Sequence, residues 1–166
     1  HVQIRWKKTL LFLNQFQACS GLDIGNRTPL TKQLEAHYNC SFKNTTIDLD
    51  EGQLIGEYDV ITAFEIIEHL FNPLHLLTEI SQVLKDEGKL YLSTPKGKPL
   101  FLWSEEHFHE MHEKSLMNLI NRAGFKMIRK ETILIHPLSF YFTGLRPFFR
   151  LFYERYWLIE LELNNK

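Results

Sequence analysis

The sequence Gly21-Leu22-Asp23-Ile24-Gly25 is a short apolar run that ends in glycine, and Thr28-Pro29 follows it closely. The apolar run predicts a buried strand, and the glycine predicts a tight turn at its end. Proline disfavours helical angles in the residue before it and fits the first turn of a helix, so Thr28 is expected to be an N-cap. Apolar residues four apart then predict the buried face of this helix, at Leu30, Leu34 and Tyr38. The stretch therefore forms a strand–turn–helix unit.

The alternation of strands and helices continues on both sides of this unit. An amphipathic helix is predicted over residues 4–17, and short extended pieces are predicted over 40–49. Tyr58–Phe64 is nearly apolar throughout, as is typical of a strand buried on both faces. The segments expected after it are a helix that Asn72-Pro73 opens, a strand at 90–93, a helix at 115–123 and a strand at 125–135. This order predicts an α/β fold, with a doubly wound, mostly parallel sheet that helices cover on both faces.

The last apolar segment, Trp157–Leu163, alternates between apolar and acidic residues. One face would carry Ile159, Leu161 and Leu163, and the other would carry Glu160 and Glu162. A period of two with one wetter face is more typical of an antiparallel strand than of a buried parallel one. We therefore expect a C-terminal antiparallel strand in this sheet.

Five motifs in this order resemble those of the class I S-adenosylmethionine (SAM)-dependent methyltransferases, from about Gly21 to Ile133. Residues 22–25 look like the first motif of that family, and Tyr58–Ile61 with Phe64–Leu70 is similar to its fourth-strand signature. The other matching segments are Val83–Gly88, Leu92–Pro95 and Arg122–Phe125. The resemblance implies a Rossmann-like domain that binds SAM and releases S-adenosylhomocysteine (SAH), with its ligands at the carboxyl ends of the strands.

The resemblance also implies which residues contact the cofactor: Asp23, Gly25, Asn44, Asp48, Leu49 and Phe64. Asp23 would orient the methionine amino group, and Gly25 would let the backbone approach the cofactor closely. Asn44 stands where the family has an acidic residue for the ribose hydroxyls. Asp48 would accept the adenine amino group, with Leu49 packing beside it. In that case the second and third strands nearly touch in sequence, and the usual helix between them is missing.

Arg27 and Pro29 stand where the family continues its glycine-rich turn. The Arg27 side chain lies beside the expected path of the cofactor, and it could turn outward, pair with the cofactor carboxylate or weaken binding. Two functions therefore remain open. The first is SAM-dependent methyl transfer to a small-molecule or glycan/lipid-linked acceptor. The second is a degenerate methyltransferase-like module that binds or assembles without catalysis.

Three histidines are candidates for assisting the acceptor. His69 follows the strand at 58–64, beside two glutamates, and could position the acceptor, remove its proton or brace the next helix. His107 and His109 belong to the densest polar segment, which is either a loop over the site, with one histidine as general base, or a plain surface loop. No metal site is expected there, because His-Phe-His is not the helical pair of zinc hydrolases and no cysteine joins it.

The bulk properties narrow the class of protein. A length of 166 residues predicts a single domain over residues 1–166. A formal net charge of −1 gives no reason to expect a nucleic-acid partner. No apolar run approaches the ~18 residues that a membrane span needs, and no signal peptide is evident. A cytoplasmic location is therefore expected.

Residues 141–157 combine many aromatic side chains with Arg146, Arg150 and Arg155. The first interpretation is a helix that covers the sheet while its arginines extend outward to solvent. The alternative is an interface, either a homodimer patch or a peripheral contact with the membrane surface that would meet a lipid-linked acceptor.

Overall fold

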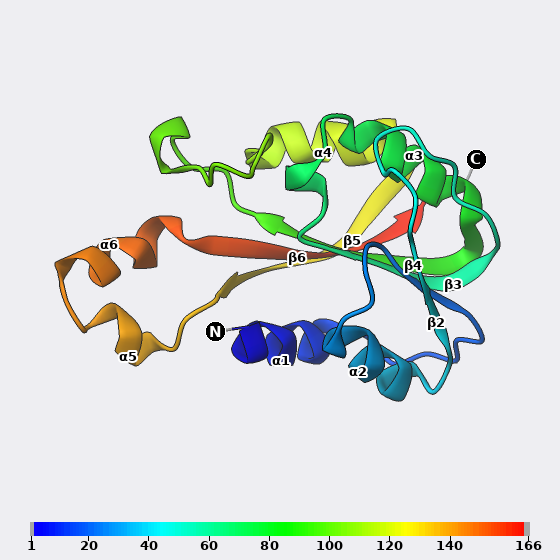
Figure 1. Ribbon diagram of the computed structural model, residues 1–166, viewed down its shortest axis with the longest axis horizontal. Helices are drawn as coiled ribbons and strands as arrows, with labels where there is room; N and C mark the ends of the chain where they lie inside the picture. The colour runs from blue at the N-terminus through cyan, green and yellow to red at the C-terminus, as the bar shows by residue number, and fades with distance from the viewer. Residues whose placement is uncertain (1, 165–166) are drawn as a thin grey trace.

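The computed structural model describes residues 2–164 and contains one six-stranded sheet (Figure 1). Its strands are β1 (Gly21–Asp23), β2 (Phe42–Asn44), β3 (Tyr58–Phe64), β4 (Leu84–Pro95), β5 (Phe125–Leu134) and β6 (Arg155–Leu163). They lie in the order β2-β1-β3-β4-β6-β5. All neighbours pair in parallel except β6, which is antiparallel to both β4 and β5. The predicted mostly parallel sheet with an antiparallel C-terminal strand is confirmed.

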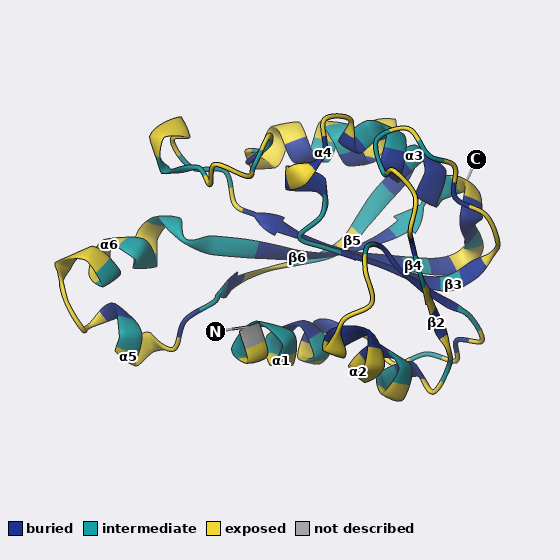
Figure 2. Ribbon diagram, viewed as in Figure 1, coloured by how far each residue is buried: buried dark blue, intermediate teal, exposed yellow. Residues whose placement is uncertain are grey.

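Helices cover both faces of this sheet, as predicted. The helices α1 (Val2–Phe12) and α2 (Pro29–Tyr38) lie on one face, and α3 (Pro73–Val83) and α4 (Glu113–Arg122) lie on the other (Figure 1). Each pair contributes to a separate apolar cluster against the sheet. The strands between the two layers are therefore mostly buried (Figure 2). Such two-sided burial explains why the β3 sequence is apolar along nearly its whole length.

The start of α2 follows from its sequence. Thr28 is the N-cap, with φ −127°, and its side chain accepts a hydrogen bond from the backbone N–H of Leu30. The Thr31 side chain bonds back to the backbone of Thr28, and Pro29 occupies the first turn. A cap of this kind stabilises a helix by about 1 kcal/mol. The predicted cap and the buried face of the helix are both confirmed.

Two predicted segments differ from the structure. The first helix ends at Phe12, not at residue 17. The expected third strand at Asp48-Leu49 is absent, because residues 45–57 form turns and loop between β2 and β3. Consequently β2 is the edge of the sheet beside β1. The segment is polar, and Asp48 uses its own carboxylate to accept the backbone N–H of Asp50, which favours a turn over an extended strand.

The prediction of a wetter face on β6 is wrong. Glu160 lies on that face, yet its side chain is 1% exposed. Asn14 donates to both carboxylate oxygens at 3.1 and 2.9 Å, and Arg129 forms an ion pair with Glu160 at 3.0 Å. These contacts come from the loop after α1 and from β5. The glutamate is buried because a neighbouring strand and loop, both distant in sequence, supply its partners.

The aromatic segment near the C-terminus does not cover the sheet, which corrects the first interpretation of residues 141–157. It forms the short helices α5 (Leu138–Tyr141) and α6 (Leu145–Tyr153), which extend past the ends of β5 and β6 (Figure 1). No residue of α6 is buried. The helix lies beyond the sheet, so its apolar side chains have no sheet surface to pack on. No helix within residues 2–164 has both the length and the hydropathy of a membrane span.

Candidate active site

A cavity of about 290 Å³ lies at the carboxyl ends of β1 and β3. The order of the strands reverses here, since β2 lies on one side of β1 and β3 on the other. Crevices at such positions are where open α/β sheets bind ligands. The lining comes from β1 and its turn, the end of β3, Ser93 of β4 and the inner face of α1, with Arg5 and Trp6. Its volume is near the lower end of the usual range for small-molecule sites.

Gly25 forms the turn that closes β1. Its φ is +97°, a backbone conformation that residues with side chains rarely adopt. A Cβ added there would lie 3.3 Å from the Ile66 side chain, inside the cavity lining. The backbone N–H of Gly25 donates to the Thr45 hydroxyl at 2.7 Å, so the loop after β2 holds the turn in place. The predicted close approach of backbone to ligand is compatible with this geometry.

Asp23 ends β1 and faces the cavity while being almost fully buried. Its carboxylate accepts hydrogen bonds from the Thr31 hydroxyl at 2.5 Å and from the Thr62 hydroxyl at 2.7 Å. Burial raises the pKa of Asp23, and these hydrogen bonds, with a weaker one from Asn44, oppose the shift. A carboxylate has about four acceptor positions. One position therefore remains for a donor such as a ligand amino group.

Asn44, at the end of β2, braces the same turn. Its side-chain amide donates to the backbone oxygens of Asp23 at 3.2 Å and Gly25 at 3.1 Å. Its Oδ1 atom is buried and has no hydrogen-bond partner among the described residues. Buried polar oxygens normally have a partner. The ribose contact predicted for Asn44 stays a prediction. Asn44 itself is not among the residues that line the cavity.

The Arg27 side chain points away from the cavity. Of the three possibilities for this residue, the structure shows the one in which the side chain turns outward. Its guanidinium donates to the backbone oxygen of Phe42 at 3.3 Å and forms an ion pair with Glu35 at 2.5 Å. The Arg27 pair lowers the pKa of Glu35. Arg27 is not among the residues that line the cavity. The turn therefore tolerates a bulky residue at this position because its side chain extends along the edge of the sheet.

Replacing Arg27 by alanine is accordingly expected to leave the affinity for SAH within about twofold of the original value, since a contact outside the pocket contributes little to binding. The pair with Glu35 is exposed to solvent, so its loss is expected to change stability little. Isothermal calorimetry with SAH measures the first effect, and thermal unfolding measures the second. A gain of tenfold or more in affinity would show that the arginine does intrude on the ligand in solution.

The remaining predicted cofactor residues divide into two groups. Phe64 lines the cavity at the end of β3. Asp48 and Leu49 do not line it: Asp48 is exposed, and Leu49 packs against the main core from the loop after β2. The adenine contact predicted for Asp48 and Leu49 stays a prediction.

His69 and His107 lie close together, and neither is among the residues that line the cavity. Their ring centroids are 4.8 Å apart, in an edge-to-face arrangement. His69 belongs to the short 3-10 helix η1 (Ile67–His69), which follows β3, while His107 belongs to the loop after η2 (Leu100–Leu102). The backbone N–H groups of Phe108 and His109 donate to the backbone oxygen of Glu68 at 2.8 and 3.2 Å, so this loop docks on η1. His109 itself turns aside, with Nε2 3.4 Å from the Phe71 oxygen.

Two glutamates accompany these histidines. Glu68 is 1% exposed, and burial raises its pKa to about 8. Glu65, which lines the cavity with a positive φ of 55°, pairs with Arg5 of α1 at 2.6 Å. Burial raises the pKa of Glu65 as well, and Arg5 opposes that shift. Neither glutamate caps α3, because Asn72 does so through the N–H of His75.

Several residues of the site were not predicted from the sequence. They are Arg5 and Trp6 of α1, Thr31 of α2, Thr45 after β2, Ser93 of β4 and Glu110 beside His107. Ser93 lies within Leu92–Pro95, but the resemblance of that segment to the family assigned no role to Ser93, and the other residues belong to no motif with a recognisable spacing. Only the amphipathic pattern of α1 gave a signal, and it predicted packing on the core, not a wall of the cavity.

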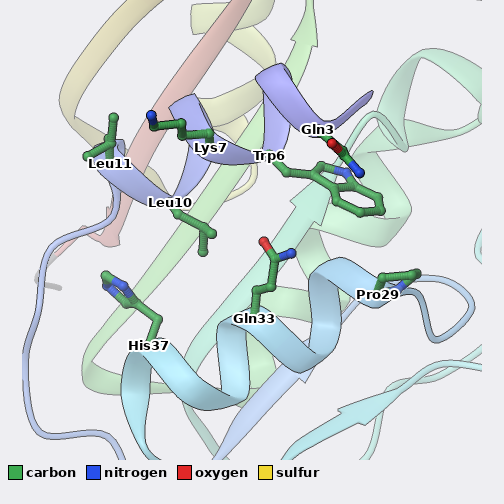
Figure 3. A pocket seen from close by; sticks show the side chains of 8 residues that line it. All are labelled: Gln3, Trp6, Lys7, Leu10, Leu11, Pro29, Gln33 and His37. Carbon is green, nitrogen blue, oxygen red and sulfur yellow. The ribbon is translucent and has the colours of Figure 1, made fainter. Parts of the chain in front are cut away.

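A larger groove of about 960 Å³ lies between α1 and α2, away from the ends of the strands (Figure 3). Its walls are mainly apolar, with Trp6 and Leu10 from one helix and His37 from the other. Trp6 lines both this groove and the cavity at β1 and β3. The groove lacks carboxylates or a glycine turn in its lining, so the smaller cavity is the candidate active site.

Comparisons with known proteins identify the family of this chain. A family model described as a methyltransferase domain matches residues 9–130. Among curated relatives, the ubiquinone biosynthesis O-methyltransferase of Vibrio campbellii is 32% identical over 79 residues, which cover 45% of this chain and 33% of that protein. The enzyme of the same name from Dechloromonas aromatica is 29% identical over 66 residues, which cover 40% and 28%. The chain thus matches only about a third of each relative's length.

Solved structures show the same fold at low identity. The N-methyltransferase NodS from Bradyrhizobium japonicum WM9 has a TM-score of 0.69 at 12% identity, with 99% of this chain and 97% of that chain covered. The same protein in complex with SAH has a TM-score of 0.71 at 13% identity, with 98% and 87% covered. The family match extends over most of the chain, and the strand order and glycine turn agree with it. The chain belongs to the class I SAM-dependent methyltransferases.

Proposed function

We propose that this chain transfers the methyl group of SAM to a hydroxyl oxygen of a small molecule, either free or linked to a lipid or glycan. The observation that carries the proposal is the cavity at the ends of β1 and β3, which Asp23, Gly25 and Phe64 line. The choice of oxygen as acceptor is supported by the curated relatives, which are named O-methyltransferases.

The chain's own residues would hold the cofactor from three directions. Asp23 would accept the methionine amino group, Gly25 would leave room for the backbone to contact the ligand, and the free Oδ1 of Asn44 would accept a ribose hydroxyl. Phe64 would pack beside the ligand from β3. The bound cofactor supplies an electrophilic sulfonium methyl group. Asp48 and Leu49 would contact the adenine from the loop after β2.

The acceptor would lie on the side of the histidines. There His69, His107 or His109 would orient the acceptor hydroxyl so that its oxygen points at the methyl carbon. Alignment of two bound reactants supplies much of the acceleration in such a displacement. Docking of the loop onto η1 would exclude water from the reacting atoms. These roles are consistent with the short distance between the His69 and His107 rings.

Two measurements test the function. Calorimetry should detect binding of SAH and SAM to the folded chain. Incubation with methyl-labelled SAM should then transfer label to phenolic or catechol acceptors and not to matched amines. Absence of binding at millimolar ligand, with the chain shown to be folded by circular dichroism, would contradict the proposal. Transfer only to amines would retain the cofactor site and overturn the choice of oxygen.

The non-catalytic alternative depended on the glycines lost at Arg27 and Pro29, on the missing unit between β2 and β3 and on the aromatic-basic tail. The first of these grounds is weakened, because the Arg27 side chain points outward and leaves the turn open. The missing unit leaves β2 at the edge of the sheet, while the cavity lies at the ends of β1 and β3.

We further propose that residues 138–153 touch a membrane surface, which would present a lipid-linked acceptor to the site. The exposed apolar side chains include Leu145, Phe149 and Phe152 of α6, and Arg146 lies on the same helix. A helix with aromatic residues on one side and arginines on the other suits the interface of an anionic bilayer. Within residues 2–164, α6 contacts the short helix α5, and none of its own residues is buried.

Replacing Phe149 and Phe152 together by glutamate should therefore reduce sedimentation with phosphatidylglycerol-containing vesicles by about tenfold, because apolar burial and charge attraction are both weakened. Ile55→Glu is the matched control, since this isoleucine is 82% exposed on a loop elsewhere. Equal loss in the control would contradict the membrane contact. A concentration-dependent mass in light scattering that the double variant abolishes would instead identify a homodimer interface.

A further inference from the structure

One cluster of side chains beside the cavity contains the residue types that bind metal ions. Glu68, His69 and His107 each present a potential ligand atom, and these atoms all lie within 4.8 Å of one another. The sequence argument against a metal concerned the spacing of His107 and His109. The structure pairs His107 with a glutamate and a histidine from a distant part of the chain.

Both histidines are oriented through one ring nitrogen. The Nδ1 of His69 lies 2.9 Å from the backbone oxygen of Glu106, and the Nδ1 of His107 lies 2.8 Å from a carboxylate oxygen of Glu110. A backbone oxygen and a carboxylate are acceptors, so each Nδ1 is assigned as the donor and each Nε2 keeps its lone pair. Histidines that ligate metals are held in this way by a carbonyl or carboxylate on the other nitrogen.

Glu68 is the only carboxylate of this cluster, and no cationic side chain among the described residues pairs with it. Its two oxygens are buried, and neither has a hydrogen-bond partner among the described residues. Burial raises the pKa of Glu68, and the Thr94 hydroxyl opposes only part of that rise. The neighbouring carboxylates each have a cation of their own, since Glu65 pairs with Arg5 at 2.6 Å and Glu110 pairs with Lys98 at 3.1 Å. A buried carboxylate without a partner is costly, and a bound cation would offset that cost.

We propose that Glu68, His69 and His107 bind a divalent transition-metal cation whose open positions receive the hydroxyl oxygen of the methyl acceptor. Two imidazoles and one carboxylate are a common set for zinc and iron, and three protein ligands leave room for a further ligand. The cluster is next to the cavity, because Glu65 and Ile66 line the cavity and η1, which carries Glu68 and His69, follows them directly.

The chemical step rests on the proposed function and balances in this way. The cation draws electron density from the acceptor oxygen, so its proton leaves more readily to solvent. The oxygen then forms a bond to the methyl carbon while the carbon–sulfur bond breaks. The electron pair of that bond stays on sulfur, and the sulfonium becomes a neutral thioether.

A titration with Co²⁺ tests the site without relying on activity. The tag-free chain is treated with a chelator, dialysed and titrated with Co²⁺, whose visible absorption reports coordination by nitrogen and oxygen. One equivalent should bind, and Zn²⁺ should displace it. Glu68→Gln, which keeps the size of the side chain, should weaken binding by at least about tenfold, because even outer-shell changes have effects of this order. His107→Ala should do the same.

His112→Ala is the matched control, since this histidine is exposed at the start of α4 and lies outside the cluster. Thermal unfolding verifies that each variant is folded. The proposal is overturned if the folded chain binds no Co²⁺, or if Glu68→Gln and His112→Ala bind it equally well. SAH binding is measured on the same samples. A chain that binds Co²⁺ as expected but not SAH would overturn methyl transfer and leave the cation site standing.

Discussion

Replacing Gly25 by alanine is expected to weaken SAH binding by at least tenfold, which corresponds to about 1.4 kcal/mol. Two effects add. A side chain at φ +97° costs about 1–2 kcal/mol in backbone strain, so the turn after β1 shifts. The new Cβ would also lie 3.3 Å from Ile66, in the wall of the cavity. Calorimetry with SAH measures the loss directly.

Gly124→Ala is the control, because it imposes similar backbone strain at a position away from the cavity. Gly124 has a similar φ of +88°, and an added Cβ there meets nothing within 4 Å. It lies between α4 and β5, away from the cavity. This variant should lose stability comparable to that lost by Gly25→Ala and keep the original affinity for SAH. If Gly25→Ala binds SAH as well as Gly124→Ala does, the turn at Gly25 is not where the ligand approaches the backbone.

Replacing Glu160 by alanine is expected to lower the free energy of unfolding by about 3 kcal/mol, near the lower end for breaking a buried pair because Arg129 is partly exposed. The substitution removes the acceptor for Asn14 and the main ionic partner of Arg129. Arg129 also donates to the backbone oxygen of Phe12, so the carboxylate links β5 and β6 to the end of α1. For a domain of this size the melting temperature should fall by roughly 6–12 °C.

Glu162→Ala provides the comparison on the same strand. Glu162 pairs with Lys89 and Lys126, and its side chain is 25% exposed. Such a pair contributes at most about 1 kcal/mol. Urea unfolding followed by circular dichroism distinguishes the two variants. Similar losses for both would mean that Glu160 behaves as an ordinary surface carboxylate and that the wetter face predicted from the alternation exists in solution.

The architecture was within reach of the sequence because its determinants are local. The Thr28-Pro29 cap, the four-residue spacing in α2 and the apolar run of β3 each depend on neighbours within a few residues. The glycine that closes β1 belongs to the same class, since the chain must turn there whatever packs around it. The resemblance to the methyltransferase family, and not these local signals, singled out Asp23, Gly25 and Phe64, and the structure places all three in the lining of one cavity.

The directions of individual side chains depended on contacts that no local pattern contains. Arg27 points outward because Glu35 and the Phe42 oxygen receive it, and Glu160 is buried because Asn14 and Arg129 reach it. A polar side chain goes where its hydrogen bonds are satisfied, and those partners come from other strands and loops.

By itself the sequence determined the α/β class, the antiparallel last strand and the glycine turn that closes β1, because period, caps and glycine act over a few residues. Only the tertiary structure decided that His107 lies beside Glu68 and His69, and that α6 lies beyond the sheet with none of its residues buried. The physical reason is that such contacts depend on how helices, strands and loops pack, and packing brings together residues that lie far apart along the chain.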